Sequence, residues 1–463
     1  MQRCYVVKII ADGSEIVQSS ATIVGEALAL PRIFGIINQN TEWRKALEEF
    51  YPMISVEEAL EKVLSMFHPL EPEEVDLLDS LGRVLAEDVF ADMDIPPLDN
   101  SAMDGYAVRA EDTKGASPEN PRPLRIIHEV PAGYISEKAV EPGTAIRIMT
   151  GAPIPPGADA VVRFEDTRRE GDIIYVLKEV KPGAEIRRAG EDVKRGELKL
   201  PKGTLIRPAE IGMLAALGKK RVKVIRRPRV AILATGDELV DLGETPGPGK
   251  IRNTNTYSNA AQVIKYGGIP IILGIARDRR EELAAKLREG IEKGADLILT
   301  SGGVSVGDFD LVKEVLALEG EITFWQVRMK PGKPLAFGVL NGKVPLLGLP
   351  GNPVSVMVAF ELFARPAILK MQGRTCLEKP TIEAILLDEI PHKDERRHFV
   401  RVMVERRGDG WYARLTGAQG SGILTSMIKA NGLAIIPEDW KRAEAGSKVK
   451  VLMLDWPEEM ACQ

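Results

Sequence analysis

Three glycine-rich loops in the second half of the chain offer backbone groups suited to an anionic ligand. They read TSGGVSVGDFD over 300–310, MKPGKPLAFG over 329–338 and GLPGNPVSV over 348–356. Small residues let backbone N–H groups approach an anion, and an amphipathic helix expected from Phe309 onward favours negative charge at its N-terminus. Each loop alone is compatible with an ordinary turn. Three such loops at successive strand ends predict a site for a phosphate-bearing ligand.

The second loop also brings two cations close together. Lys330 and Lys333 are separated only by a Pro-Gly pair, so both ammonium groups can face one oxyanion. In the third loop, Asn352 lies between a glycine and a proline, just before another expected helix. These side chains favour an oxyanion site beside the phosphate loops.

Acidic residues follow the apolar runs that precede the loops. Asp237 and Glu238 come directly after the run VAILA, Asp278 follows the next run, and Asp308 and Asp310 follow the third. Mg²⁺ takes one or two carboxylates together with substrate phosphate. Acids at a helix N-terminus, stabilised by the helix dipole, are the alternative explanation for the pair at 237–238. The recurrence of acids after three runs favours a magnesium site.

An alternation of short apolar runs and helical patterns must position these residues. Strands are expected at 230–234, 269–275 and 297–300, with helices at 256–268 and 279–294. Such alternation predicts an open parallel sheet, in which ligands bind outside the carboxyl ends of the strands. All three loops are therefore expected at one rim.

The regions on either side of this sheet have different patterns. Ser55 and Glu58 form a capping box before a helix, and a second helix is expected over 77–85. Short apolar alternations predict β structure near both ends of the chain. The expected domains are an N-terminal extension over 1–52, a helical and extended linker domain over 53–95 plus 191–228, a β-rich inserted domain over 96–190, an α/β domain over 229–373 and a small C-terminal β-barrel over 374–463.

Bulk properties exclude several classes of protein. A net charge of −5 gives no electrostatic case for nucleic acid or an anionic membrane. No apolar run reaches the length that crosses a bilayer, so a cytoplasmic location is expected. The three cysteines form no CxxC pair, so neither a disulfide framework nor a zinc site is indicated, and the four histidines show no HExxH or paired-ligand spacing. Residues 1–52 are either a real appendage or precede a true start at Met53, and the second is favoured.

Together with DNSAMDGYAV over 99–108, the three loops closely resemble the molybdopterin molybdenumtransferase family, which includes MoeA and the E domain of gephyrin. The resemblance covers the chain from about residue 54 onward. It implies an α/β domain of the molybdopterin-binding type. It also implies an enzyme that binds adenylylated molybdopterin and molybdate, cleaves the pyrophosphate with Mg²⁺, and releases AMP and molybdenum cofactor. The sequence does not distinguish molybdate from tungstate as the substrate, because both are tetrahedral oxyanions of nearly equal size.

The resemblance assigns roles to individual residues. The expected catalytic residues are Asp104, Thr150, Asp192, Glu238, Asp310, Lys330 and Lys333. The expected metal ligands are Asp237, Glu238 and Asp310. The expected substrate-binding residues are Arg187, Ser301, Gly302, Gly303, Asp278, Pro334, Gly351, Asn352, Ser355, Arg401, Ser421 and Ser426. In one departure, Gln326 stands where family members often carry Lys or Arg, and Arg328 is expected on the same face of the strand.

The resemblance also implies assembly and partners. A homodimer is expected, in which the β-rich domain of one subunit completes the cleft of the other. The molybdopterin adenylyltransferase and apo-molybdoenzymes are candidate partners. Two alternatives stay open: the adenylyltransferase itself, which resembles the central domain alone, and a non-catalytic scaffold of the gephyrin kind.

Overall fold

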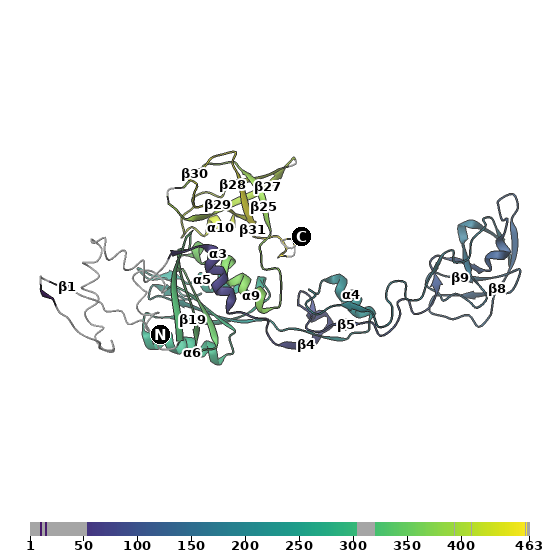
Figure 1. Ribbon diagram of the computed structural model, residues 1–463, viewed down its shortest axis with the longest axis horizontal. Helices are drawn as coiled ribbons and strands as arrows, with labels where there is room; N and C mark the ends of the chain where they lie inside the picture. Colours follow the sequence, from purple (N-terminus) through teal and green to yellow (C-terminus); the bar gives the residue numbers. More distant parts are fainter. Residues whose placement is uncertain are drawn as a thin grey trace.

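The computed structural model describes residues 10–11, 14–15, 53–302 and 320–460, apart from 393, 409 and 459. The described chain is elongated (Figure 1), with the β-rich part around β8 and β9 at one end, the region of α4, β4 and β5 in the middle, and the central sheet with the C-terminal barrel at the other end. Most of the expected extension over 1–52 and the helix expected from Phe309 lie outside the described residues. The domain boundaries given above stay predictions.

The central sheet is mixed rather than wholly parallel, so the expectation of a parallel sheet was wrong in part. β19, β16, β20 and β24 are parallel neighbours, whereas β23 runs antiparallel to β24 and to β21. A tight Asn341-Gly342 turn, with both residues at positive φ, joins β23 to β24 as a hairpin. The strand order is β19 (Ile269–Ala276), β16 (Arg229–Thr235), β20 (Leu297–Ser301), β24 (Val344–Leu349), β23 (Pro334–Leu340), β21 (Gly320–Val327) and β3 (Met53–Ile54).

Helices cover both faces of this sheet because β16 alternates its side chains between two cores. Val230 and Ile232 pack with α3, α5, α8 and α9, whereas Ala231 and Leu233 pack with α6. The expected cap is confirmed in part, because Ser55 Oγ accepts from the Glu58 N–H at 3.0 Å. The helices are α3 (Val56–Ser65), α5 (Asn255–Lys265), α6 (Arg280–Glu292), α8 (Pro353–Ala359), a π-helical turn η4 (Phe360–Ala364) and α9 (Arg365–Met371).

The linker region contains less helix than expected. The second helix over 77–85 is wrong: strand β4 pairs with β15, and only one 3₁₀ turn, η1, follows. Leu78 and Leu81 of this segment are exposed. The helix of this region is α4. The elements here are β4 (Pro72–Asp76), η1 (Leu77–Ser80), β5 (Val89–Phe90), β14 (Leu198–Leu200), α4 (Pro208–Ala216) and β15 (Arg221–Ile225).

The expected β-rich domain and C-terminal barrel are both present. The first is a six-stranded sheet in the order β10 (Ala160–Arg163), β7 (Gly105–Val108), β9 (Thr144–Ile148), β8 (Arg122–Val130), β12 (Ile173–Val176) and β11 (Thr167–Glu170). The second closes on itself because β27 pairs with both β28 and β29. Its five strands are β25 (Thr381–Leu386), β27 (Arg397–Arg407), β28 (Gly410–Leu415), β29 (Gly432–Ile436) and β31 (Lys448–Met453). The multidomain α/β fold class is therefore confirmed.

Two further observations bear on expectations from composition. Cys376 is disulfide-bonded, which the spacing of the cysteines did not indicate. Among the described residues, none of the helices combines the length and apolar character needed to span a membrane.

Candidate functional site

The described start of the first glycine-rich loop, residues 300–302, lies beside the other two loops at one end of the strands of the central sheet. Gly302 follows β20, its N–H donates to the Leu349 carbonyl at 3.3 Å, and Gly351 follows β24. The second loop precedes β23, but β23 runs antiparallel to β24, so its first residues lie at the same edge. The antiparallel hairpin therefore preserves the convergence that the parallel sheet was expected to provide.

Glycine is required at position 302, where the first loop approaches the end of β16. Gly302 has φ of +91°, and a Cβ atom there would lie 2.6 Å from the Thr235 carbonyl oxygen. A Cβ atom at Gly351 would lie 3.5 Å from the Cα of Gly302, and one at Gly332 would lie 3.5 Å from the Ser355 carbonyl oxygen. The backbones of all three loops are thus within contact distance of one another or of α8.

Buried hydroxyl groups lie under this edge. The Oγ atoms of Thr235, Thr300 and Ser301 are buried and have no hydrogen-bond partner among the described residues. Asn255 at the start of α5 donates from Nδ2 to the Gly351 carbonyl at 2.7 Å. Sequence reasoning missed Asn255, whose only signal was its place at a helix start after the first predicted strand.

The second loop also contacts the C-terminal barrel. β22 (Met329–Lys330) pairs with β27, with Lys330 opposite His398. The Lys330 ammonium, half-exposed, lies 3.3 Å from Asp394 Oδ2. Arg396 also binds Asp394, and its hydrogen bonds hold the pKa of that carboxyl well below its usual value. Asp394 was not predicted, because its role depends on contacts between two domains.

Lys333 and Pro334 belong to the second loop, and Ser355 lies close to it. The Lys333 carbonyl accepts from the Val327 N–H at 2.8 Å, and Ser355 is buried in the first turn of α8. Asn352 is the N-cap residue of that helix. Arg328 is exposed, and its carbonyl accepts from the Arg397 N–H at 3.0 Å. That the Arg328 side chain supplies the positive charge that Gln326 lacks stays a prediction.

Arg401 is the largest fully buried side chain of the described residues and has an unusual environment. Its Nε donates to Ser426 Oγ at 3.1 Å and its Nη2 to the Gly420 carbonyl at 3.2 Å. Among the described residues no carboxylate lies within ion-pair distance, and burial lowers the pKa of Arg401 to about 10. The guanidinium therefore stays protonated at neutral pH, with its charge unneutralised by an acid.

The loop that holds Arg401 also touches the helix after the third glycine-rich loop. The Val354 N–H, at the start of α8, donates to the Ser421 carbonyl at 3.0 Å. The Oε1 of Gln419, a residue that was not predicted, accepts from the backbone N–H of Arg401 at 3.0 Å and so fixes the backbone of Arg401. The barrel thus brings Arg401, Ser421 and Ser426 next to the predicted oxyanion loops.

The predicted metal ligands come together only in part. The Asp237 N–H donates to Asp278 Oδ2, the Asp278 N–H donates to Asp237 Oδ1, both at 3.3 Å, and the Glu238 carboxylate folds over Gly236. Two facing carboxylates at exposed positions fit a hydrated Mg²⁺, which needs one or two of them. Asp308, Asp310 and Gly303 lie outside the described residues.

In the β-rich part, hydrogen bonds gather three predicted segments. Thr150 donates to Asp104 Oδ1 from both its N–H and its hydroxyl, each at 2.7 Å, and these bonds lower the pKa of Asp104. Strand β13 (Ile186–Arg187) pairs with β6 (Asn100–Ser101), which brings Arg187 beside the DNSAMDGYAV segment. Asp192 is tied to the same region by its N–H, which donates to Ile95.

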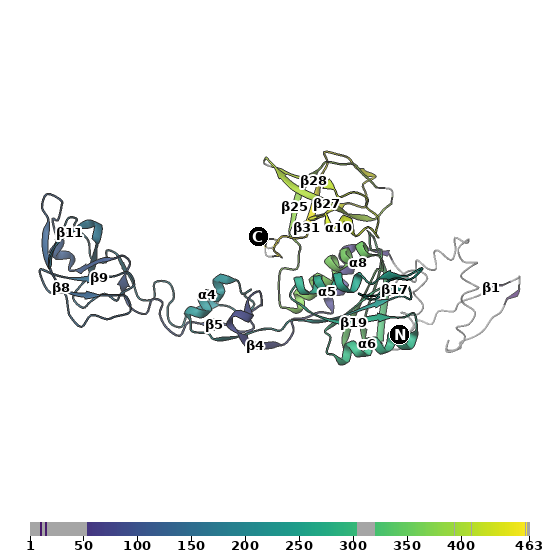
Figure 2. The same cartoon turned by 180° about the vertical axis from the view of Figure 1, so that it is seen from behind.

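This second cluster lies far from the loops within one chain. Figures 1 and 2 both place β8 and β9 at the opposite end of the molecule from the sheet of β19, with β4, β5 and α4 in between. Asp104 and Thr150, which lie at the ends of β7 and β9 in the same sheet, therefore do not reach Lys330 of the same chain in this conformation.

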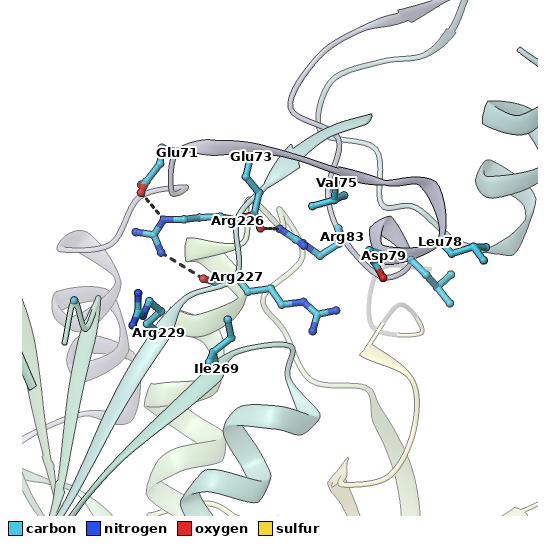
Figure 3. A pocket seen from close by; sticks show the side chains of 12 residues that line it. Glu71, Glu73, Val75, Leu78, Asp79, Arg83, Arg226, Arg227, Arg229 and Ile269 are labelled. Atoms are coloured by element: carbon cyan, nitrogen blue, oxygen red, sulfur yellow. Dashed lines mark hydrogen bonds and ion pairs between the residues drawn. The ribbon is translucent and has the colours of Figure 1, made fainter. Parts of the chain in front are cut away.

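A cavity of about 1140 Å³ lies where the linker joins the sheet (Figure 3) and contains none of the predicted site residues. Arg226 forms two 2.6 Å hydrogen bonds with Asp296 and also binds Glu71, while Arg83 binds Glu73. These ion pairs connect the linker strands to the sheet. The cavity therefore lies between two structural regions of the chain and has no link to the predicted site.

Comparisons with known proteins agree with this architecture. Three family models match successive regions: the MoeA N-terminal region (domain I and II) over 54–218, a probable molybdopterin binding domain over 231–370, and the MoeA C-terminal region (domain IV) over 383–454. The matches on both flanks argue against a protein that resembles the central domain alone.

Individual relatives match over nearly their whole length. A molybdopterin molybdenumtransferase of Nostoc sp. (strain PCC 7120 / SAG 25.82 / UTEX 2576) is 38% identical over 427 residues, which are 90% of this chain and 98% of the relative. One from Bacillus subtilis (strain 168) is 39% identical over 415 residues, 87% and 96% respectively. The crystal structure of the molybdopterin biosynthesis moeA protein from Pyrococcus horikoshii OT3 aligns with a TM-score of 0.74 at 38% identity, covering 87% of this chain and all of that chain.

Proposed function

The chain belongs to the MoeA family, and we propose that it is a molybdopterin molybdenumtransferase of molybdenum cofactor biosynthesis, which inserts molybdate into adenylylated molybdopterin and releases AMP. The observation that carries the proposal is the meeting of cations and anion-binding loops at one edge of the sheet. Lys330 and Lys333 lie in a loop that touches both α8 and the barrel, and Arg401 is buried where the barrel touches α8.

We assign the oxyanion substrate to this cationic group. Arg401 is pre-positioned by Ser426 and Gly420, so its planar guanidinium loses little freedom when it binds an oxyanion. Lys330 and Lys333 add two point charges from the neighbouring loop. The same chemistry binds tungstate, so the choice between the two oxyanions is left to the test.

We assign the pyrophosphate to the loops of Gly302 and Gly351. Their backbones lie close together at this rim, and Ser301, Pro334, Asn352 and Ser355 belong to the same three loops, so we expect fixed backbone and hydroxyl dipoles there to orient the phosphate oxygens. Asp237, Glu238 and Asp310, the expected ligands, would hold Mg²⁺ after their side chains turn toward one ion, with Asp278 beside Asp237. When bound, the ion would offset charge on the leaving phosphate. The chain itself contributes orientation and fixed charges, and its role requires no side-chain nucleophile.

We further propose that the active form is a homodimer. Asp104 and Thr150 are joined by hydrogen bonds at the ends of β7 and β9, and these strands lie at the far end of the molecule from the central sheet. A site that uses both clusters needs a second copy of the chain. The cytoplasmic location, the adenylyltransferase and the recipient apo-enzymes stay predictions.

The activity can be measured directly on the purified chain. Adenylylated molybdopterin is incubated with Mg²⁺ and either molybdate or tungstate, and released AMP is quantified by chromatography. We expect AMP release that requires both Mg²⁺ and an oxyanion, and a loss of the Mg²⁺ response in Asp237→Asn. Absence of turnover together with capture of a protein partner would instead favour a gephyrin-like scaffold.

A further inference from the structure

We propose that His392, Asp394 and His398 form a binding site for a divalent transition-metal ion such as Zn²⁺, and that this ion competes with Lys330 for Asp394. The site is separate from the Asp237 region. Its existence does not depend on the reaction proposed above.

The three side chains already lie within reach of one ion. One ligand atom from each lies within 4.8 Å of the other two, and no other such group of histidine, cysteine and acidic residues occurs among the described residues. The ring centroids of His392 and His398 are 4.2 Å apart, and Asp394 lies between the two histidines in the sequence. Ligand atoms bonded to zinc at about 2.0–2.1 Å are about 3.3 Å apart in a tetrahedron. Small side-chain rotations therefore close the site.

Hydrogen bonds fix the orientation of the ligands. The Nε2 of His392 lies 2.8 Å from the Arg396 carbonyl oxygen, which can only accept, so Nε2 carries the proton. The Nδ1 atom is left as the basic nitrogen of that ring. A histidine ligand whose other N–H donates to a backbone carbonyl is the usual outer-shell arrangement of zinc sites. The Nε2 of His398 lies 2.9 Å from Asp394 Oδ1, so a ligand nitrogen and a ligand oxygen are already adjacent.

The ligand set selects the kind of ion. Two imidazoles with one carboxylate suit Zn²⁺, Co²⁺ or Ni²⁺, whereas Mg²⁺ takes oxygen ligands. Both rings are buried, which keeps them in place, and Asp394 is partly exposed, which gives an ion access. Three protein ligands also leave a fourth position for water or a bound anion.

Two cations next to Asp394 oppose metal binding, because they compete with the ion for the same carboxylate. Arg396 and Lys330 both bind this carboxylate, at 2.8 and 3.3 Å from Oδ2. The side chain of Lys330 is 50% exposed and that of Arg396 is 28% exposed, so each can turn toward solvent. A bound ion would draw charge from the carboxylate that Lys330 contacts, so metal binding weakens the Lys330 contact and favours Lys330 turning toward the glycine-rich loops.

The test is a zinc titration of the full chain after removal of metal by a chelator. Zinc uptake is followed by competition with a chromophoric chelator, in buffer with excess Mg²⁺. We expect one tight zinc per chain in the wild type, and a loss of affinity of at least tenfold in Asp394→Asn and in His398→Gln. His68→Gln, which removes an exposed histidine elsewhere, is the matched control and should bind like the wild type.

Two further measurements keep the test decisive. Co²⁺ should give the intense visible absorption of a four-coordinate ion in the wild type and lose it in His398→Gln. Lys330→Ala should bind zinc about two- to fivefold more tightly, the range that exposed ion pairs are worth. The proposal is overturned if the wild type takes up no zinc, if the ligand variants bind as the wild type does, or if Lys330→Ala weakens binding.

Discussion

Gly302 shows how one residue can decide whether the site forms. Its backbone is in the left-handed region, and the Thr235 carbonyl occupies the space where a side chain would begin. Strain of this kind costs about 1–3 kcal/mol for a residue other than glycine. The close approach of the loops therefore depends on the absence of a Cβ atom here.

We expect Gly302→Ala to lower the free energy of unfolding by more than 2 kcal/mol and to weaken nucleotide binding, because strain and a backbone clash add at this position. Gly342→Ala is the matched control, since Gly342 also has positive φ but no atom within 4 Å of an added Cβ. Denaturant unfolding compares the two. Equal losses in both variants would show that the contact with Thr235 has no cost.

The loops and lysines of the site could be read from the sequence because each is a local pattern. The environment of Arg401 could not be predicted, because Gly420 and Ser426 contact it only through the tertiary fold of the barrel, which the periodicity of the sequence does not specify. The bond of Thr150 to Asp104 spans 46 residues and had no local signal either. Local chemistry was thus predictable, whereas contacts between distant segments needed the structure.

At the scale of elements, a buried ion network connects the barrel to the helical layer. Lys379, just before β25, lies 3.0 Å from Glu361 in η4 and 3.0 Å from Glu458 after β31. Arg365 binds Glu458 at 2.6 Å, and Tyr266 at the end of α5 donates to Glu361. The network therefore fixes the segments just before and just after the barrel to the helical layer.

We expect Lys379→Met to destabilise the protein by about 3–5 kcal/mol, because it leaves Glu361 and Glu458 with Arg365 as their one remaining buried cation among the described residues. Lys429→Met, at an exposed position, is the control. Thermal unfolding of both variants is the measurement. A change below about 1 kcal/mol for Lys379→Met would mean that the network does not hold the barrel in place.

Two errors at this scale have physical causes. Strands β23 and β24 were expected in a parallel sheet, but the Asn341-Gly342 pair, a strong hairpin signal, was present in the sequence and had been overlooked. The segment 77–85 has leucines at helical spacing, but its neighbour β4 pairs with β15, a strand about 145 residues away. Tertiary pairing overrode the local pattern in that segment.

At the scale of the whole molecule, the separation of the two clusters predicts complementation between subunits. Asp104→Ala and Lys330→Ala should each be inactive, because each removes one half of every shared site. Mixed after subunit exchange, they should recover partial activity, since hybrid dimers contain one site with both halves intact. The measurement is AMP release by the mixture, with exchange proven by differently tagged subunits.

The control is a mixture of two variants within one cluster, Lys330→Ala with Lys333→Ala. These variants alter the same half of the site, so a hybrid dimer of the two has no intact site. Failure of the first pair to recover activity after proven exchange would mean that each site is built within a single chain.

The most direct test of the account is AMP release against molybdate concentration, for the wild type and Lys333→Ala. Loss of one charge-assisted contact should weaken oxyanion binding by about 1.5–3 kcal/mol, or roughly ten- to a hundredfold. We predict that Lys333→Ala binds adenylylated molybdopterin as the wild type does but needs about that much more molybdate for half-maximal release, while Lys343→Ala, in the remote hairpin turn, is unchanged. Wild-type release that is indifferent to molybdate, or a Lys333→Ala defect confined to nucleotide affinity, would contradict it.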